Sequence, residues 1–130
     1  MNKLIRGAAA LALFVGVSST AMAGGWKEGV LWNEANVGGD LNGFTAVQIE
    51  FGFEPGKCSG PLTTVGEWLR VTEGKFSFAY ADKTVERGAD ADAWYHSAGT
   101  TVEVCNKGDS NAILVGIQFR PVVSDQPTTQ

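Results

Sequence analysis

The stretches EWLRVTEG (Glu67–Gly74) and ADAWYHSAGTTVEVCN (Ala91–Asn106) decide the fold of this chain. Each combines short apolar or β-branched runs with Gly, Ser, Asp and Asn, the residue types that favour turns. The same mixture continues on both sides of these stretches, and no long period of 3.6 residues interrupts it. The pattern predicts a single all-β domain, either a sandwich or a barrel.

The neighbouring strands follow from the alternation of apolar and polar residues. Phe44–Phe53 (FTAVQIEFGF) alternates clearly, which predicts a half-buried strand. One face carries Ala46, Gln48, Glu50 and Gly52, and the other carries Thr45, Val47, Ile49, Phe51 and Phe53. The other predicted strands are Val30–Trp32, Glu67–Thr72, Lys75–Ala81, Thr84–Glu86, Ala93–His96, Thr101–Cys105 and Ala112–Phe119.

Several segments are predicted to be irregular. Ser59–Val65 is a small, uncharged connection, and Arg120-Pro121 ends the last strand. Arg87–Asp92 is a polar loop that lacks the ligand density of a calcium loop. Gly38–Gly43 is a turn, because it has neither the Lys-Ser/Thr ending nor the following helix of a phosphate-binding loop.

The first residues have the pattern of an export signal. Lys3 and Arg6 precede the apolar run Ala8–Val17, and Ala21-Met22-Ala23 places small residues at the two positions that a signal peptidase reads. A membrane anchor is the alternative, but the apolar run is shorter than the roughly 20 residues that span a bilayer. We therefore expect a signal peptide over residues 1–23, cleavage near Ala23 and a periplasmic or secreted protein.

The remaining chain is one small acidic domain. Removing residues 1–23 leaves 107 residues, and the loss of Lys3 and Arg6 leaves 8 basic and 14 acidic residues, a net charge of −6. Nucleic acids and anionic membrane surfaces are bound through clustered Lys and Arg, so neither is expected as a partner. We expect a domain over residues 24–121 and a flexible tail over residues 122–130.

The chain has two cysteines, Cys58 and Cys105. In an oxidising compartment the simplest interpretation is one disulfide, which encloses the 46 residues between them. A pair of thiolate ligands or a redox pair is the alternative, although no CxxC spacing supports it.

The two opening stretches resemble the motifs of the cupin superfamily. Glu67 and Gly74 fit the second half of the first motif, G(X)5HXH(X)3-4E(X)6G. The second motif, G(X)5PXG(X)2H(X)3N, fits from Ala91 with every spacing kept and with Gly99 and Asn106 identical. The resemblance covers about residues 44–121 and implies a cupin-like jelly-roll barrel of two antiparallel sheets.

The same comparison implies that the usual metal site has been lost. The motif histidines that hold a metal in cupins fall at Leu62, Thr64 and Val102, and only Glu67 is retained. A lone carboxylate is a poor transition-metal site, which needs three or four donors in one geometry. The chain has a single histidine, His96. We expect neither a metal nor another cofactor.

Glu67 is the first candidate for chemistry. The resemblance places it at the barrel mouth beside Leu69 and Val71, where a carboxylate can act as a general acid or base. The alternative is a carboxylate that is solvated or paired with a cation such as Arg70 or Arg120.

His96 is the second candidate, as a proton shuttle on the strand Ala93–His96, where it shares a face with Trp94. Metal-free sugar epimerases of the cupin superfamily imply that a histidine with an acidic partner suffices on this fold, and Asp90 or Asp92 could orient it. The alternative is an exposed or hydrogen-bonded histidine at a strand end.

Two tryptophans precede the region of resemblance. Trp26 and Trp32 either stack against a sugar or aromatic ligand or plug one end of the barrel, and burial of large aromatics in small cores favours the plug.

Three functions are compatible with the sequence. The first is a binding module whose barrel cavity holds a small organic ligand. The second is a metal-independent isomerase, lyase or hydrolase on a sugar or small acid, with proton transfer by Glu67 and His96. The third is a homodimer used as an interaction domain. The residues expected to contact a ligand in the cavity are Glu67, Phe76, Phe78, Trp94 and Val102.

Overall fold

The computed structural model describes residues 25–39 and 41–122. The predicted signal peptide, its cleavage near Ala23 and the tail beyond residue 122 lie outside the described residues. Within the described part no helix is long and apolar enough to cross a membrane.

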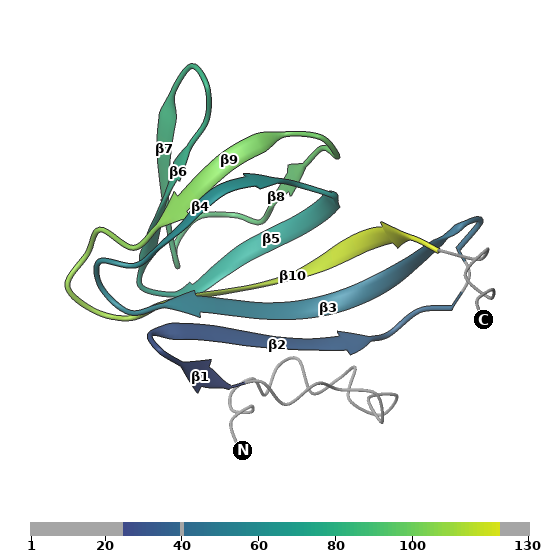
Figure 1. Cartoon of the computed structure of the whole chain (residues 1–130), viewed down its shortest axis with the longest axis horizontal. Helices are drawn as coiled ribbons and strands as arrows, with labels where there is room; N and C mark the ends of the chain where they lie inside the picture. The colour runs from purple at the N-terminus through teal and green to yellow at the C-terminus, as the bar shows by residue number, and fades with distance from the viewer. Residues whose placement is uncertain (1–24, 40, 123–130) are drawn as a thin grey trace.

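Two antiparallel sheets make up the domain, and in Figure 1 the smaller one lies over the larger. The six-stranded sheet has the order β1-β2-β3-β10-β5-β8, and the four-stranded sheet has the order β4-β9-β6-β7. The hairpin of β6 and β7 projects beyond the other strands (Figure 1). The strands are β1 (Trp26–Lys27), β2 (Val30–Asn36), β3 (Phe44–Phe53), β4 (Cys58–Thr63), β5 (Gly66–Glu73), β6 (Lys75–Ala79), β7 (Thr84–Gly88), β8 (Trp94–His96), β9 (Thr101–Cys105) and β10 (Ala112–Pro121).

Alternate side chains of both sheets point between them and form one core. The predicted alternation of β3 is confirmed, since Val47, Ile49 and Phe53 are buried in this core. Aromatic rings from the two sheets meet there, with Phe76 stacked on Phe51 at 5.9 Å between ring centroids. The barrel is therefore filled by its own side chains over much of its length.

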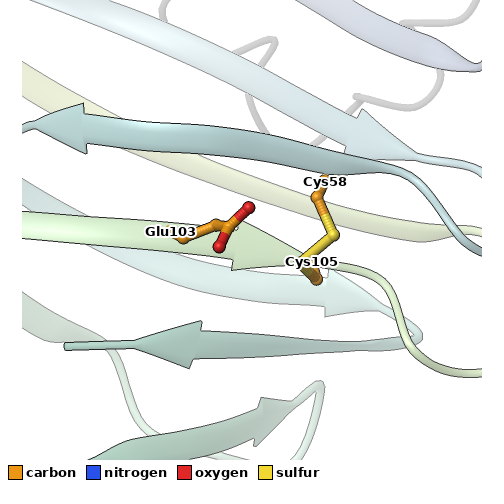
Figure 2. A group of neighbouring side chains, drawn as sticks. All are labelled: Cys58, Glu103 and Cys105. Atoms are coloured by element: carbon orange, nitrogen blue, oxygen red, sulfur yellow. A yellow bond between two sulfur atoms is a disulfide. The ribbon is translucent and has the colours of Figure 1, made fainter.

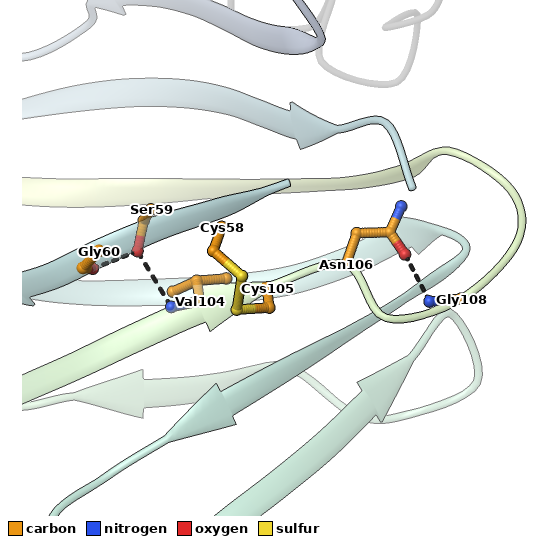
Figure 3. Close-up of a disulfide and its surroundings, with 7 residues drawn as sticks. All are labelled: Cys58, Ser59, Gly60, Val104, Cys105, Asn106 and Gly108. Atoms are coloured by element: carbon orange, nitrogen blue, oxygen red, sulfur yellow. Dashed lines mark hydrogen bonds between the residues drawn. A yellow bond between two sulfur atoms is a disulfide. The ribbon is translucent and has the colours of Figure 1, made fainter. Parts of the chain in front are cut away.

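Gly74 and Asn106, two residues of the cupin-like motifs, hold the turns in which they lie. Gly74 joins β5 to β6 with φ 69°, and a Cβ atom there would collide with the Asn111 carbonyl oxygen, so glycine is needed on both counts. Asn106 is 1% exposed, and its side-chain amide donates to the carbonyl oxygens of Phe53 and Ser110. Its Oδ1 accepts from the Gly108 N–H (Figure 3).

The predicted disulfide between Cys58 and Cys105 is confirmed. The two residues lie directly opposite each other in the pairing of β4 with β9, so the bond links neighbouring strands (Figure 3).

The expected connection at Ser59–Val65 is wrong, because Cys58–Thr63 forms β4 at the edge of the smaller sheet. Pairing with β9 makes it a strand despite the Gly and Pro that obscured the pattern. The last strand also continues beyond its expected end through Pro121, because Arg120 and Pro121 still pair with residues of β3. Arg87 belongs to β7 rather than to a loop.

The predicted tryptophan plug is wrong. Trp26 is 41% exposed and Trp32 is 38% exposed. Trp26 lies in the two-residue edge strand β1, and Trp32 packs only edge-on against Phe51, with ring centroids 5.9 Å apart. Neither side chain closes the barrel.

Candidate functional site

Glu67 and His96 face each other between the two sheets. The antiparallel pairing of β5 with β8 places them directly opposite, on the inward side of the six-stranded sheet. His96 Nδ1 lies 3.0 Å from Glu67 Oε2, and the two residues are only 5% and 7% exposed. The two candidates chosen from the sequence are thus brought together. A solvated Glu67 and an exposed His96 are both incorrect alternatives.

Tyr80 extends this pair to a chain of three groups. Its hydroxyl oxygen lies 2.6 Å from His96 Nε2. Tyr80 follows β6 in the four-stranded sheet, and its backbone N–H donates to the Lys83 carbonyl oxygen in the β6–β7 hairpin. The sequence placed Tyr80 within the predicted strand Lys75–Ala81 but indicated no role for it, because its partner lies 16 residues away in the other sheet.

The neighbours of His96 fix its tautomer. The Trp94 indole N–H, which can only donate, lies 3.4 Å from His96 Nε2. Nε2 is therefore the acceptor, so Nδ1 carries the proton and donates it to the Glu67 carboxylate. The Tyr80 hydroxyl then donates to the same Nε2. The result is an O–H···N–C–N–H···O⁻ array that runs from Tyr80 to Glu67.

A second set of polar side chains holds Glu67 from the other side. The Gln118 amide donates to Glu67 Oε1 at 2.9 Å. Gln118 Oε1 in turn accepts from Arg120 Nε at 2.9 Å, and Arg120 Nη2 pairs with Glu34 at 2.9 Å. Both carboxylate oxygens of Glu67 are occupied, so its orientation is set. Arg120 reaches Glu67 only through Gln118.

Arg87 lies beside this array with spare hydrogen-bonding capacity. It points inward from β7, opposite the buried Phe76, and its guanidinium carbon lies 4.2 Å from the centre of the Trp94 ring. Its Nε atom is buried and has no hydrogen-bond partner. Among the described residues no carboxylate forms an ion pair with Arg87.

Burial, more than the neighbouring charges, sets the protonation of Tyr80. Burial raises the pKa of the Tyr80 phenol above its ordinary value of 10.0; the positive charge of Arg87 opposes this shift and the negative charge of Glu67 reinforces it. The phenol is therefore protonated at neutral pH. In the resting state Tyr80 is a proton donor.

Asp90 and Asp92 do not take the orienting role expected for them. Both are exposed, and the acidic group bonded to His96 is Glu67. Arg70, the other cation considered as a partner of Glu67, is exposed as well, because alternate residues of β5 face opposite sides of the sheet.

The other residues expected to contact a ligand are core residues. Phe76, Phe78 and Val102 are at most 2% exposed and pack in the barrel interior. Trp94 lies at the boundary, in contact with both Phe78 and His96. Of the positions where cupins carry metal-binding histidines, Leu62 and Val102 are cross-strand neighbours and both are apolar.

Two surface hollows lie away from the Glu67–His96 pair, and neither is lined by it. One, of about 360 Å³, lies near the turn at Gly74 and the loop Asn106–Ser110. The other, of about 180 Å³, is lined mainly by apolar atoms near Trp68 and Ile117 on the six-stranded sheet. Trp68 is exposed and packs against Tyr95, with ring centroids 5.4 Å apart.

Solved structures with a similar fold include proteins of the cupin superfamily. A predicted oxalate decarboxylase from Thermotoga maritima is 16% identical with a TM-score of 0.54, over 70% of this chain and 81% of that protein. A cupin superfamily protein from Desulfitobacterium hafniense is 11% identical with a TM-score of 0.54, over 73% and 81%. The Cupin_2 domain of an XRE family transcriptional regulator from Enterobacter cloacae is 12% identical with a TM-score of 0.57, over 73% and 99%.

Comparison by sequence adds no relative. No family model matches this chain. No curated protein matches it either.

Proposed function

We propose that this chain, which has the cupin fold, is a metal-independent enzyme that transfers a proton on a small anionic substrate. The observation that supports the proposal is the hydrogen-bonded series of Tyr80, His96 and Glu67. A hydroxyl, an imidazole and a carboxylate in this order form the arrangement by which a hydroxyl group is activated without a metal.

The half-buried phenol of Tyr80 is the member of the series that meets the substrate, because Glu67 and His96 are covered. A substrate proton moves to the Tyr80 oxygen while the phenol proton moves to His96 Nε2. The imidazolium that forms is stabilised by the Glu67 carboxylate, and the substrate is left as an anion. Return of the proton to another position or face of the substrate gives an isomer and restores the resting enzyme.

Arg87 is the residue from which we infer that the substrate is anionic. Its charge is close enough to Tyr80 to influence the phenol, and its Nε retains an unused donor. A carboxylate bound by the guanidinium would lie beside the phenol, and the same positive charge would stabilise the anion that proton removal creates.

Deuterium exchange tests this function without knowledge of the substrate. The protein is incubated in D₂O with a panel of small hydroxy- and keto-carboxylates, and loss of C–H signals is followed by proton NMR. We expect exchange in at least one carboxylate, and a decrease of about 100-fold or more for Tyr80→Phe. Tyr95→Phe, which removes the exposed tyrosine, is the matched control. Equal exchange by wild type and Tyr80→Phe would refute the role of Tyr80.

Binding of a small anion without chemistry is the second candidate, and the unpaired Nε of Arg87 is the observation that favours it. The two candidates are distinguished by their variants. A binding protein loses the carboxylate-induced rise in Tm with Arg87→Gln and keeps it with Tyr80→Phe. An enzyme shows exchange that both variants diminish.

We place this activity outside the cytoplasm. The Cys58–Cys105 disulfide supports this location, because such bonds persist in oxidising compartments. Alkaline phosphatase fused after residue 30 would be active in the periplasm of a bacterial host if residues 1–23 direct export, and inactive if they do not.

A further inference from the structure

A second group of chemically active side chains lies on β4 and β9, at the disulfide. Cys58, Glu103 and Cys105 place one sulfur, oxygen and sulfur atom respectively within 4.8 Å of one another. Figure 2 shows the Glu103 carboxylate beside the sulfur atoms. This group is separate from the Tyr80–His96–Glu67 series and takes no part in the proposed function.

The sheet itself brings these three residues together. Cys58 is paired directly with Cys105, and Glu103 lies two residues before Cys105 on the same side of β9. That side faces outward, because the intervening Val104 is a core residue. Glu103 is half-buried, and its carboxylate has no hydrogen bond or ion pair among the described residues.

We propose that reduction of this disulfide creates a binding site for a thiophilic divalent ion such as Zn²⁺. A dithiol reduces the Cys58–Cys105 bond with two electrons and two protons and is itself oxidised to a disulfide. The two thiols then release their protons as the ion binds both sulfur atoms, and the Glu103 carboxylate is the third ligand. Water completes the tetrahedral coordination that Zn²⁺ prefers.

The donor set fits such an ion better than a hard one. Thiolates select zinc and other borderline or soft ions, whereas Mg²⁺ and Ca²⁺ prefer oxygen ligands throughout. While the sulfur atoms are bonded to each other neither can act as a thiolate, so the oxidised protein lacks two of the three ligands.

The framework around the cysteines does not depend on the disulfide alone. The backbone N–H of Val104 donates to Ser59 Oγ at 3.0 Å, and β9 also pairs with β6 on its other side (Figure 3). Cys58 is exposed, which gives a reductant access to the bond. The three ligands are therefore held near one another after reduction, and the site is formed before the ion arrives.

Metal titration of the reduced and oxidised protein tests the proposal. The disulfide is reduced with a water-soluble phosphine, which becomes the phosphine oxide, and the reagent is removed under argon. Titration with Co²⁺ alone is followed by thiolate-to-metal charge-transfer absorption, and Zn²⁺ is used in competition. We expect one ion per reduced chain, none per oxidised chain, and a rise in Tm with Zn²⁺ only for the reduced protein.

Three variants identify the ligands. Cys58→Ser removes the charge-transfer band, and Glu103→Gln weakens binding by about tenfold or more. Glu86→Gln is the matched control, because Glu86 is an exposed carboxylate of the same sheet and pairs with Lys75. The Co²⁺ affinity of this variant should equal that of the wild type. Equal affinity for Glu103→Gln and wild type overturns the proposal. A reduced protein that binds no Co²⁺ overturns it as well. So does a reduced protein that is unfolded by circular dichroism and does not refold when Zn²⁺ is added.

Discussion

The Nδ1 atom of His96 lies 3.0 Å from Oε2 of Glu67, and the two side chains are only 6% and 9% exposed. A covered imidazole with a carboxylate on one nitrogen and a phenol on the other has a fixed ring orientation and a fixed direction for proton movement. Substitutions at this pair and at its partner Tyr80 therefore test the stability of the site and its proposed activity.

Glu67→Gln should destabilise the protein by about 1–3 kcal/mol. The Glu67 carboxylate accepts from two donors, His96 and Gln118. An amide at this position has a single acceptor oxygen, so one buried N–H would face another N–H. Urea unfolding measures the loss. Glu73→Gln, at the exposed end of the same strand, is the control and should stay within about 0.5 kcal/mol of wild type. Similar losses for both variants would show that the Glu67 contacts contribute nothing specific.

Tyr80 should make the stability of the protein fall with rising pH in the alkaline range. Because the folded-state pKa of Tyr80 is raised, the folded protein favours the neutral phenol. This contribution is fully present below the unfolded value of about 10 and is lost as the pH rises through the folded value, since the unfolded chain ionises first.

Urea unfolding between about pH 8 and pH 11 checks this. The wild-type free energy of unfolding should fall more steeply than that of Tyr80→Phe. Tyr95 is the other of the two tyrosines of the chain, so Tyr95→Phe is the control. It should keep the wild-type dependence of the unfolding free energy on pH. A slope that changes only with Tyr95→Phe would contradict the assignment.

Gly74→Ala should destabilise the domain more than Gly99→Ala does. Both glycines have positive φ, 69° and 84°, where an L-residue is disfavoured by about 1–2 kcal/mol. A Cβ atom at Gly99 meets no atom within 4 Å, whereas at Gly74 it collides with backbone atoms of Asn111 and Ala112. We expect an additional loss of roughly 2 kcal/mol or more for Gly74→Ala. Equal shifts in the urea midpoint would show that the turn relaxes freely.

Replacing both cysteines by serine should destabilise the domain by about 3–4 kcal/mol, because the disulfide restricts the unfolded chain across a sequence separation of 47 residues. Chemical denaturation in the presence of a chelator measures this value and keeps any metal effect out of it. The oxidised wild type and its phosphine-reduced form should differ by a similar amount. An unchanged midpoint for the double variant would mean that the rest of the smaller sheet fixes β4 unaided.

The strands with strong local patterns were predictable from the sequence. Phe44–Phe53 and Thr101–Cys105 have the observed bounds, because the alternation of each is unbroken and turn residues flank it. The strand Cys58–Thr63 was not predicted, since its Ser, Gly and Pro give no alternation and its structure depends on pairing with β9. Long-range pairing of this kind leaves no local signal.

The site was also predictable only where a local signal exists. Glu67 and His96 stood out as the motif carboxylate and the single histidine, and strand register brings them together. Tyr80 and Arg87 come from the β6–β7 hairpin, and nothing local shows which way it folds. One signal was available for Gln118, which is an unusual polar residue in the apolar run AILVGIQF.

The Tyr80–His96 hydrogen bond joins one sheet to the other. Tyr80 belongs to the hairpin of the four-stranded sheet, and His96 belongs to the edge strand of the six-stranded sheet. A slight parting of the sheets would break this contact while each ladder of backbone hydrogen bonds stayed whole. The proposed activity would then be lost in a protein that is still folded, and a molecule bound between the sheets at this point would inhibit it without resembling the proposed substrate.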